Sequence, residues 1–386
     1  MVQKAVLSMT TETVAKGLEG IVAAETELSY VNGQDGILEY VGIPIHQLAE
    51  QSSFEEVVFL LWHRRLPKAS ELESFKNEIR SQYTISHHTE SLLKCIPASA
   101  GPMHALQTAV SFIGCLNPQA DEITIPALRR NGIHLLAKLP TIVAHFDCLR
   151  KDKELLDPDP NMSLAENFLY ILNGKKPKPA MAKALDTCLI LHADHGLNAS
   201  TFTARVVSST LSDLYSAVSA AIGALRGSLH GGANERVMHM LQEIGSLSKA
   251  DAFIRGKIAR KEKVMGFGHR VYKTKDPRAV YLKTLAHELA VQTGYENLFE
   301  ISNRVEEIMA ELVADKGIYP NVDFYSATTY RSIGFEVDLF TPIFAVSRVG
   351  GWVGQVIEQH GDNRIMRPKA KYIGPHNVDY VPAENR

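Results

Sequence analysis

Hydrophobic residues recur at helical spacing along most of this chain of 386 residues. From about residue 46 the apolar positions follow the i, i+3, i+4 pattern of amphipathic helices. In residues 53–62 a serine precedes two glutamates and an apolar face, which is the order expected at the start of a helix. The same pattern, interrupted by turns that contain proline, predicts further helices over 71–82, 103–115, 122–149, 163–173 and 180–194.

Two segments are apolar on every side. Residues 214–225 are small and apolar, and residues 339–357 are apolar apart from Arg348. A helix of this kind is predicted to be buried, at the centre of the molecule or between subunits. Arg348 therefore needs a partner, because an unpaired buried charge is costly.

The only β signal is at the beginning of the chain. Two alternating runs, 27–31 and 37–41, flank the turn Asn32-Gly-Gln-Asp-Gly36 and predict a small hairpin. Strand runs that alternate with helices are absent, so the chain is not a doubly wound α/β protein. The sequence predicts an all-α fold with a large helical domain, a smaller helical domain and a small N-terminal β-hairpin.

The charge pattern predicts where the domains divide. Residues 231–331 are more charged than their surroundings, which is typical of a smaller and more exposed lobe. We therefore assign 1–226 and 332–386 to the large domain and 227–331 to the small domain. A site in the cleft between them would draw on the loops at both junctions.

Composition narrows the function classes. The hydrophobic fraction is 45% and the net charge is −2, so no general basic surface for nucleic acid or membrane is expected. The charged residues Lys4, Glu12 and Lys16 argue against a signal peptide and favour the cytoplasm. The four cysteines form no CxxC, and we expect buried thiols in a reducing compartment, with no disulfide frame or zinc site.

The candidate chemistry lies in three segments, Gly-Ser-Leu-His-Gly-Gly (227–232), Gly-Phe-Gly-His (266–269) and Pro-Asn-Val-Asp (320–323). Singly, His230 and His269 would each be assigned a structural role in a tight turn. Together with Asp323 they indicate catalysis, because two hydrogen-bond donors opposed to one base are what enolisation next to a carbonyl requires.

Other motifs are weaker. The glycines at 266 and 268 fail as a dinucleotide fingerprint, since Val271 stands where the third glycine would be and no strand precedes them. His192 and His195, three residues apart on a predicted helix, could hold a metal or could simply pack at the helix end. No third ligand is evident, so no metal site is predicted.

Three arginines, Arg278, Arg348 and Arg367, are each unremarkable alone. Gathered in one cleft, their guanidinium forks would suit a ligand that carries more than one carboxylate.

Over nearly its full length the chain resembles the citrate synthase family. The matching segments are Gly17-Leu-Glu-Gly20 with the hairpin, His192–Thr201, Leu229–Asn234, Met265–Arg278, Asn321–Ser326, Ser347-Arg348 and Arg364–Pro368. The resemblance implies a cytoplasmic homodimeric acyltransferase of the tricarboxylic acid cycle. Its reaction is the condensation of acetyl-CoA with oxaloacetate, followed by thioester hydrolysis, without a further cofactor.

The resemblance also implies residue roles. Asp323 would take a proton from the methyl group of acetyl-CoA, His230 would hydrogen-bond the thioester oxygen, and His269 would polarise the ketone of oxaloacetate. The oxaloacetate and citrate carboxylates would be held by His195, Arg278, Arg348 and, from the other subunit, Arg367. Coenzyme A would contact Lys273 and the segment Met265, Gly266, Phe267 and Gly268.

One stretch departs from the family pattern, since many relatives have His-Pro-Met-Asp where this chain has Gly101-Pro-Met-His104, and an arginine where Gln107 stands. A near alternative is 2-methylcitrate synthase, which uses propionyl-CoA, because one methylene discriminates by only about 1–3 kcal/mol. A catalytically silent helical scaffold or regulatory subunit and a metal hydrolase built on His192 and His195 are the more distant alternatives.

Overall fold

The computed structural model describes residues 14–386, which divide into two compact units. One unit runs from Thr26 to Arg364, and the other combines Ile365–Arg386 with the described part of the first 25 residues. Lys4 and Glu12, used above in the argument about targeting, lie outside the described residues. The predicted boundaries at 226/227 and 331/332 both fall inside the first unit, and the two-domain division stays a prediction.

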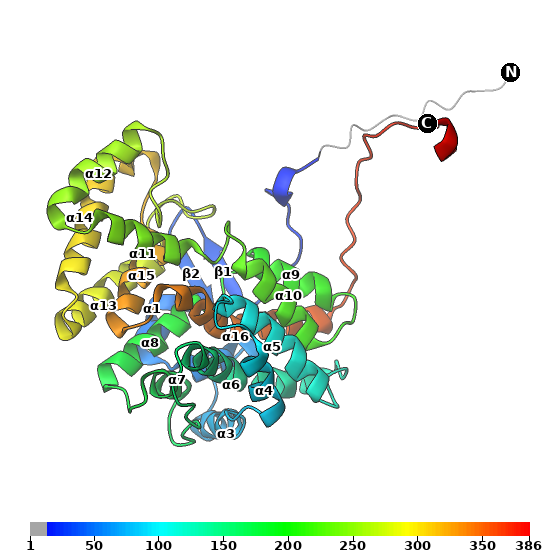
Figure 1. The fold of residues 1–386 in the computed structure, drawn as a ribbon, viewed down its shortest axis with the longest axis horizontal. Coiled ribbons are helices and arrows are strands. Elements are labelled where there is room, and N and C mark those ends of the chain that lie inside the picture. The colour runs from blue at the N-terminus through cyan, green and yellow to red at the C-terminus, as the bar shows by residue number, and fades with distance from the viewer. Residues whose placement is uncertain (1–13) are drawn as a thin grey trace. The chain divides into compact units, whose positions relative to one another are not determined.

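Helices dominate the described residues, as the sequence pattern indicates (Figure 1). They are α1 (Ile45–Gln51), α2 (Phe54–His63), α3 (Ala69–Arg80), α4 (His87–Cys95), α5 (Pro102–Leu116), α6 (Ile125–Leu149), α7 (Leu164–Asn173), α8 (Pro179–His192), α9 (Ala199–Ser208), α10 (Leu214–Arg226), α11 (Ala233–Ile244), α12 (Leu247–Ala259), α13 (Pro277–Thr293), α14 (Glu296–Val313), α15 (Val322–Ile333) and α16 (Phe340–Gly361). Short 3₁₀ turns occur at Lys16–Leu18, Ala314–Lys316, Val337–Leu339 and Ala383–Asn385.

The predicted hairpin forms, and a third strand joins it. Strands β1 (Ser29–Asn32) and β2 (Ile37–Tyr40) pair antiparallel, with Ser29 opposite Tyr40. The two-residue strand β3 (Ile43–Pro44) then pairs with β2 and was not anticipated from the sequence.

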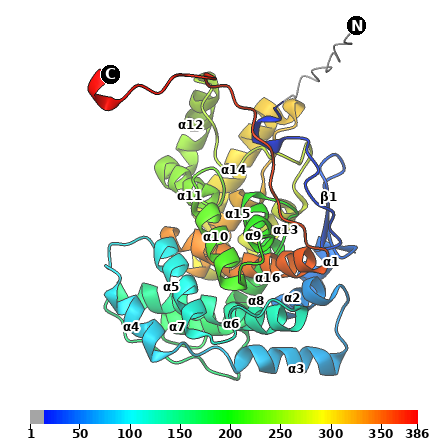
Figure 2. The same ribbon diagram turned by 90° about the vertical axis from the view of Figure 1, so that its right-hand side faces the viewer.

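The core of the larger unit is built around α16, which packs against α2, α6, α8, α9 and α10 (Figures 1 and 2). Nearly every side chain of this helix is buried, including Arg348 and Trp352. Helix α10 packs on α9 and α5 and buries most of its small apolar side chains. Both segments that are apolar on all sides are therefore buried helices, as predicted.

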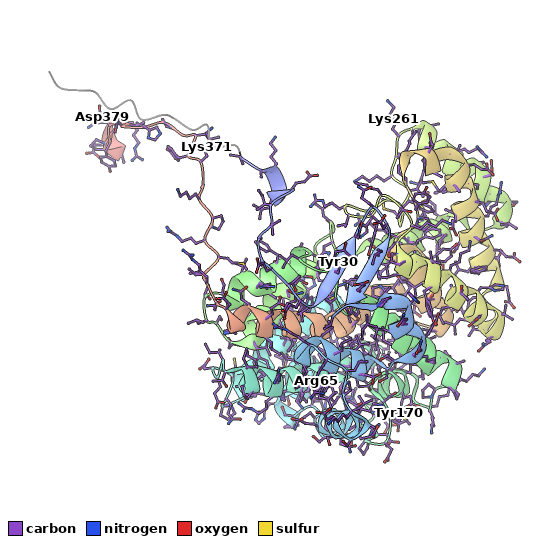
Figure 3. The ribbon with its side chains drawn as sticks, turned by 180° about the vertical axis from the view of Figure 1, so that it is seen from behind. Tyr30, Arg65, Tyr170, Lys261, Lys371 and Asp379 are labelled. Atoms are coloured by element: carbon purple, nitrogen blue, oxygen red, sulfur yellow. The ribbon has the colours of Figure 1, made fainter. Side chains whose placement is uncertain are left out.

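Helices α11 to α15 pack mainly on one another, with α12 against α14 and α13 against α15. They lie at one end of the 26–364 unit, so Lys261, just beyond α12, is far from Tyr170 on α7 (Figure 3). The helix starts follow the sequence: the Ser53 hydroxyl caps α2, and Asp276 and Asn321 cap α13 and α15. The last two caps fix the helix ends that carry site residues.

Two expectations were wrong. Helix α8 ends at His192, so His195 is not on a helix with it, because Gly196 turns the chain at φ +57° and Asn198 caps the next helix. The cysteines are all free, but only Cys148 and Cys188 are buried. Cys95 and Cys115 are exposed, since each lies on the outer side near the end of its helix.

The stretch that departs from the family pattern lies at the start of α5, which packs against α10. The Gln107 side-chain amide donates to the carbonyl of Ser219 at 3.2 Å, and the hydroxyls of Ser111 and Ser219 lie 2.8 Å apart. Gln107 thus takes part in the packing of α5 on α10, and its hydrogen bond within residues 14–386 is not to a candidate catalytic residue.

Candidate active site

The site residues come from the ends of helices and from the loops between them. His195 lies between α8 and α9, His230 between α10 and α11, and His269 between α12 and α13. Arg278 and Asp323 each occupy the second position of a helix, α13 and α15. At such positions the backbone N–H has no acceptor within the helix, and here the caps Asp276 and Asn321 accept it, each at 3.0 Å.

The glycine loop before His269 is tied directly to the start of α15. The Gly268 N–H donates to Tyr319 O and the Asn321 N–H donates to Gly266 O, each at 2.9 Å, and the Asn321 side chain donates to Gly268 O at 2.9 Å. Gly266 has φ +79°, and a Cβ there would come within 2.8 Å of Phe324. Glycine is therefore required at 266, and the loop brings His269 beside the helix that carries Asp323.

His269 carries its proton on one particular nitrogen. Its Nδ1 accepts the backbone N–H of Val271 at 3.0 Å and that of Tyr272 at 3.2 Å. Backbone amides only donate, so Nδ1 is unprotonated and Nε2 carries the hydrogen. Burial, assisted by Arg278, lowers the pKa of His269 to about 4, so above that pH the ring is a neutral N–H donor.

His230 is held in the opposite tautomer. Its Nε2 accepts the backbone N–H of Ser200 at 3.3 Å and lies 2.9 Å from the Ser200 hydroxyl. That hydroxyl also accepts from the Trp352 indole at 3.2 Å, and its one proton lies within reach of two acceptors, Asn198 Oδ1 at 2.8 Å and His230. The Ser200 N–H is therefore the donor that sets the tautomer. The Nδ1 therefore carries the hydrogen, and burial, assisted by Arg348, lowers the pKa of His230 to about 4.

Asp323 has the character of a base. Burial raises the pKa of Asp323 to about 6, and Arg278 opposes this shift. Among residues 14–386 no group donates a hydrogen bond to its carboxylate, whereas its backbone N–H donates to Asn321 at 3.0 Å and its backbone carbonyl accepts from the Ser326 hydroxyl at 3.2 Å. An ionised carboxylate without donors is a stronger proton acceptor than one that is already hydrogen-bonded.

The two buried arginines differ in their partners. Arg278 forms a bidentate pair with Asp276, at 3.0 Å from Nε and 2.8 Å from Nη2. Burial acts against the guanidinium, yet Asp276 raises the pKa of Arg278 above its ordinary value. Asp276 also accepts the N–H of Val322 at 3.2 Å and so links the starts of α13 and α15.

Arg348 has no carboxylate within ion-pair distance among residues 14–386. Its Nε donates to the carbonyl of His192 at 2.6 Å, and the guanidinium lies 4.7 Å from the centre of the Phe344 ring. Burial lowers the pKa of Arg348 to about 10, which leaves it charged at neutral pH. The partner expected for this buried charge is thus a carbonyl and an aromatic face, and the nitrogens at the end of the fork remain available to an anion.

His195 contacts the loop of His269 by a hydrogen bond with Tyr272, a residue that the sequence reasoning missed. Its Nε2 lies 3.1 Å from the Tyr272 hydroxyl, and the rings of His195 and His269 are 5.3 Å apart. Burial, assisted by Arg278, lowers the pKa of His195 well below its ordinary value. Tyr272 is only 2% exposed, and its place within the 265–278 segment was the available signal.

Two further residues escaped the sequence reasoning. Asp276 could have been found as the polar residue before Pro277, where a helix cap is expected. Ser200 stands in the quoted 192–201 segment, but nothing in the sequence places it beside His230.

The two buried arginines also affect the pKa values of the other candidate residues. The charge of Arg348 lowers the pKa of both His230 and Asp323, after burial has acted on each. Arg278 has the same effect on His195 and His269. The guanidinium groups of Arg278 and Arg348 thus act on three histidines and one carboxylate.

The residues expected to contact coenzyme A border this cluster. Lys273 is exposed, and its backbone N–H donates to the carbonyl of Gly33 in the β1–β2 turn at 2.8 Å. Met265 and Phe267 are half-buried. A Cβ on Gly33 would come within 2.0 Å of the Val271 carbonyl, so the hairpin packs directly on this loop.

Arg367 is exposed and belongs to the unit formed by the terminal segments. Its role stays a prediction.

The alternative based on a metal gains no support. His192 is fully buried, and its Nδ1 lies 2.7 Å from the carbonyl of Cys188. Within residues 14–386 no three side chains of the His, Cys, Asp or Glu type are grouped to hold a metal ion.

In the same part of the chain, every helix is too short or too polar to span a bilayer.

Two neutral imidazole donors and a half-buried carboxylate that accepts no hydrogen bond from residues 14–386 are the kinds of group that proton removal next to a carbonyl requires. The chain matches the family described as "Citrate synthase, C-terminal domain" over residues 17–369. It is 48% identical to citrate synthase 2 of Bacillus subtilis, over 97% of this chain and 100% of that protein. It is 46% identical to a citrate synthase of Deinococcus radiodurans, over 97% and 99%.

A solved structure gives the same result. The citrate synthase of Thermoplasma acidophilum, in a ternary complex with carboxymethyl coenzyme A and oxaloacetate, has a TM-score of 0.92 at 33% identity over 97% of this chain and 100% of that chain. The chain belongs to the citrate synthase family, and it is an enzyme of the acyltransferase class. A 2-methylcitrate synthase of Mycobacterium tuberculosis is 41% identical, which is less than the two citrate synthases above.

Proposed function

We propose that this enzyme condenses acetyl-CoA with oxaloacetate and then hydrolyses the thioester to give citrate and coenzyme A. The observation that carries the proposal is the set of fixed tautomers: His230 and His269 each keep one N–H free, beside an Asp323 whose carboxylate accepts no hydrogen bond from residues 14–386.

The first step is removal of a methyl proton. A thioester methyl is a weak acid, so a carboxylate alone is an inadequate base for it. In the proposal Asp323 takes the proton while the Nδ1–H of His230 donates to the thioester oxygen. A preorganised donor of this kind contributes roughly 10²–10³ in rate.

The second step is attack of the enolate carbon on the ketone of oxaloacetate. The Nε2–H of His269 would polarise the ketone oxygen and then protonate the alkoxide. Both histidines are neutral above pH about 4, so each enters its step as an N–H donor. The proton that Asp323 took from the methyl group then returns, through solvent, to the His269 ring that gave one to the alkoxide. Water then attacks the thioester carbonyl, and the C–S bond breaks to release coenzyme A as the thiol.

Oxaloacetate binding would fall to His195, Arg278 and Arg348. Arg348 is the strongest candidate because it has no carboxylate partner of its own within the described chain. Arg278 is already paired with Asp276 through Nε and Nη2, so Nη1 is the nitrogen it would offer. Lys273 and the backbone of Met265–Gly268 would receive coenzyme A. We propose no cofactor beyond these substrates.

The test is a thiol-release assay on the purified protein with oxaloacetate and either acetyl-CoA or propionyl-CoA. Faster release with acetyl-CoA supports the proposal. Faster release with propionyl-CoA would make the protein a 2-methylcitrate synthase, the activity named for the relative at 41% identity. No release with either would contradict both.

We also propose that the enzyme is a cytoplasmic homodimer and that Arg367 serves the partner's site. Four free cysteines fit a reducing compartment. The Arg364–Pro368 match to the family is what supports the role of Arg367.

Mixing two inactive variants tests the shared site. Arg367→Ala dimers lack a carboxylate fork, and Asp323→Ala dimers lack the base. In a mixed dimer one site has both lesions and the other has neither, so random exchange should restore roughly a quarter of the sites by two-fold symmetry. If mass measurements verify exchange and no activity returns, Arg367 acts within its own subunit.

A further inference from the structure

Arg236 on α11 contacts the loop that carries His230. Its Nε donates to the carbonyl of Gly232 at 3.2 Å, and its Nη2 donates to the carbonyl of Ser228. These two carbonyls lie on either side of His230 in the chain, so one guanidinium bridges the loop across the histidine.

An arginine at this place in a helix needs a reason. Helix α11 begins at Ala233, and Gly232 before it offers no side-chain cap. The start of a helix is its positive end, which disfavours a cation in the first turns. The neighbouring Glu235 accepts a hydrogen bond from Thr341 of α16. Among residues 14–386 Arg236 has no carboxylate partner within ion-pair distance, so the two loop carbonyls are its recorded acceptors.

The loop has few other attachments. The His230 N–H donates back to Gly227 O at 2.9 Å, and the Gly231 N–H donates to Leu225 O at 2.8 Å. Ser228 is exposed, and the Leu229 side chain is 97% exposed. The Thr341 hydroxyl of α16 also donates to the Gly231 carbonyl at 3.4 Å, and Ser200 holds the His230 ring. Without Arg236, the exposed 228–229 part of the loop would depend on the bonds at its two ends.

We propose that Arg236 is a positioning residue for the reaction, which holds the Ser228–Gly232 segment so that His230 stays in place while Asp323 removes the methyl proton. This inference rests on the proposed function. It assigns a role to a side chain that contacts neither substrate in the mechanism above.

The charge of Arg236 supplies a second effect. The charged groups that act on Asp323 are Arg278 and Asp276 at the start of α13, Arg348 of α16 and Arg236 of α11. Burial raises the pKa of Asp323, whereas the positive charge of Arg236 opposes that rise. Removal of the charge should therefore move the acid limb of the pH profile to higher pH.

The experiment compares Arg236→Met, which loses fork and charge, with Arg236→Lys, which keeps the charge. Arg255→Met is the matched control, because Arg255 pairs only with surface carboxylates on α12 and α14. The measurements are kcat, the KM for oxaloacetate, the pH profile of kcat, and the exchange of acetyl-CoA methyl protons with solvent in the presence of a non-reacting oxaloacetate analogue.

For Arg236→Met we expect kcat and methyl exchange to fall about tenfold, which is the loss of one or two hydrogen bonds from a charged donor. The KM for oxaloacetate should stay within about twofold, and the acid limb should move to higher pH. Arg236→Lys should have an intermediate kcat and an acid limb at the wild-type position. A melting curve for each variant separates these effects from loss of fold, and Arg236→Lys remains informative if Arg236→Met does not fold.

The inference is overturned if Arg236→Met matches Arg255→Met in exchange rate and pH profile. A fully active Arg236→Lys would also overturn the positioning role, since a lysine cannot bridge both carbonyls with a rigid fork. Failure of the proposed function is a separate result, because it would show as absence of condensation by the wild-type enzyme.

Discussion

His230 and His269 are both neutral rings with one free N–H, but different contacts fix the tautomer of each. His269 is fixed by two amides of its own loop, Val271 and Tyr272. His230 is fixed from outside its loop, by Ser200 at the start of α9. The first arrangement is set by the backbone and survives a change of side chain, whereas the second depends in part on a hydroxyl and on how two helices sit together. The comparison predicts that the two histidines respond differently to perturbation.

The largest effect should come from the group that both histidines serve. Asp323→Asn should lower kcat by roughly 10²–10⁴, the usual cost of losing a general base, while oxaloacetate binding persists. A steady-state assay and calorimetric titration with oxaloacetate measure the two. A variant within a few-fold of the wild type would remove Asp323 from the mechanism.

The same variant should be more stable than the wild type at neutral pH. The folded-state pKa of Asp323, about 6, lies above the unfolded value, so its ionisation destabilises the fold as pH rises. Melting temperatures should therefore coincide below pH about 4, separate in favour of Asp323→Asn between pH about 4 and about 6, and stay apart by a constant amount above that. Equal melting temperatures at pH 8 would show that the carboxylate is not desolvated as described.

Alanine at each histidine should separate the two half-reactions. Each change should reduce turnover by roughly 10²–10³, the cost of one oxyanion donor. His230→Ala should abolish methyl-proton exchange from acetyl-CoA in the presence of an oxaloacetate analogue. His269→Ala should leave this exchange largely intact, because its donor faces the ketone. If exchange is unchanged in His230→Ala, the assignment of the two donors is wrong.

The pH profile should report one carboxylate. Asp323 must be ionised to act as base, so activity should fall as pH drops through about 6. The two histidines have pKa values near 4 and should add no limb between pH 5 and 8. A second ionisation in that interval, seen in log kcat against pH, would mean that one imidazole titrates there.

The smallest effect isolates the difference between the loops. Ser200→Ala removes a hydroxyl from His230 and should slow methyl exchange by roughly fivefold, the value of one hydrogen bond. Thr201→Ser nearby is the matched control, since it keeps a hydroxyl and does not contact His230. No equivalent substitution exists for the two amides at His269. An exchange rate unaffected by Ser200→Ala would mean that the backbone N–H of Ser200 alone fixes the tautomer.

The sequence was sufficient for the choice of catalytic candidates and for eight of the helices, α2, α3, α5 to α8, α10 and α16, whereas α4, α9 and α11 to α15 were not located individually. Periodicity located α2, α5 and α6 to within a few residues, because apolar spacing reflects burial on one face. It was insufficient where the chain turns back on itself. The end of α8 was misplaced, since apolar spacing continues past His192 while Gly196 stops the helix.

Contacts between distant residues were beyond sequence reasoning altogether. The support of His230 by Ser200 and Arg236, and the pairing of Tyr272 with His195, depend on how helices pack in three dimensions. Local pattern predicts which residues are candidates, whereas packing decides which nitrogen of each ring is free.

The contact between Gly33 and the loop at 271–273 affects the order in which the protein folds as it is synthesised. The β1–β2 turn leaves the ribosome early. Its Gly33 carbonyl can accept the Lys273 amide only after residue 273 has been made, and Ser29 can donate to Asp194 only after a further 165 residues. Contacts of such separation form late, because a long loop must first be closed. Strand β1, although it is made first, should therefore be among the last elements to pack. During refolding, the helical circular-dichroism signal should return before the enzymatic activity does.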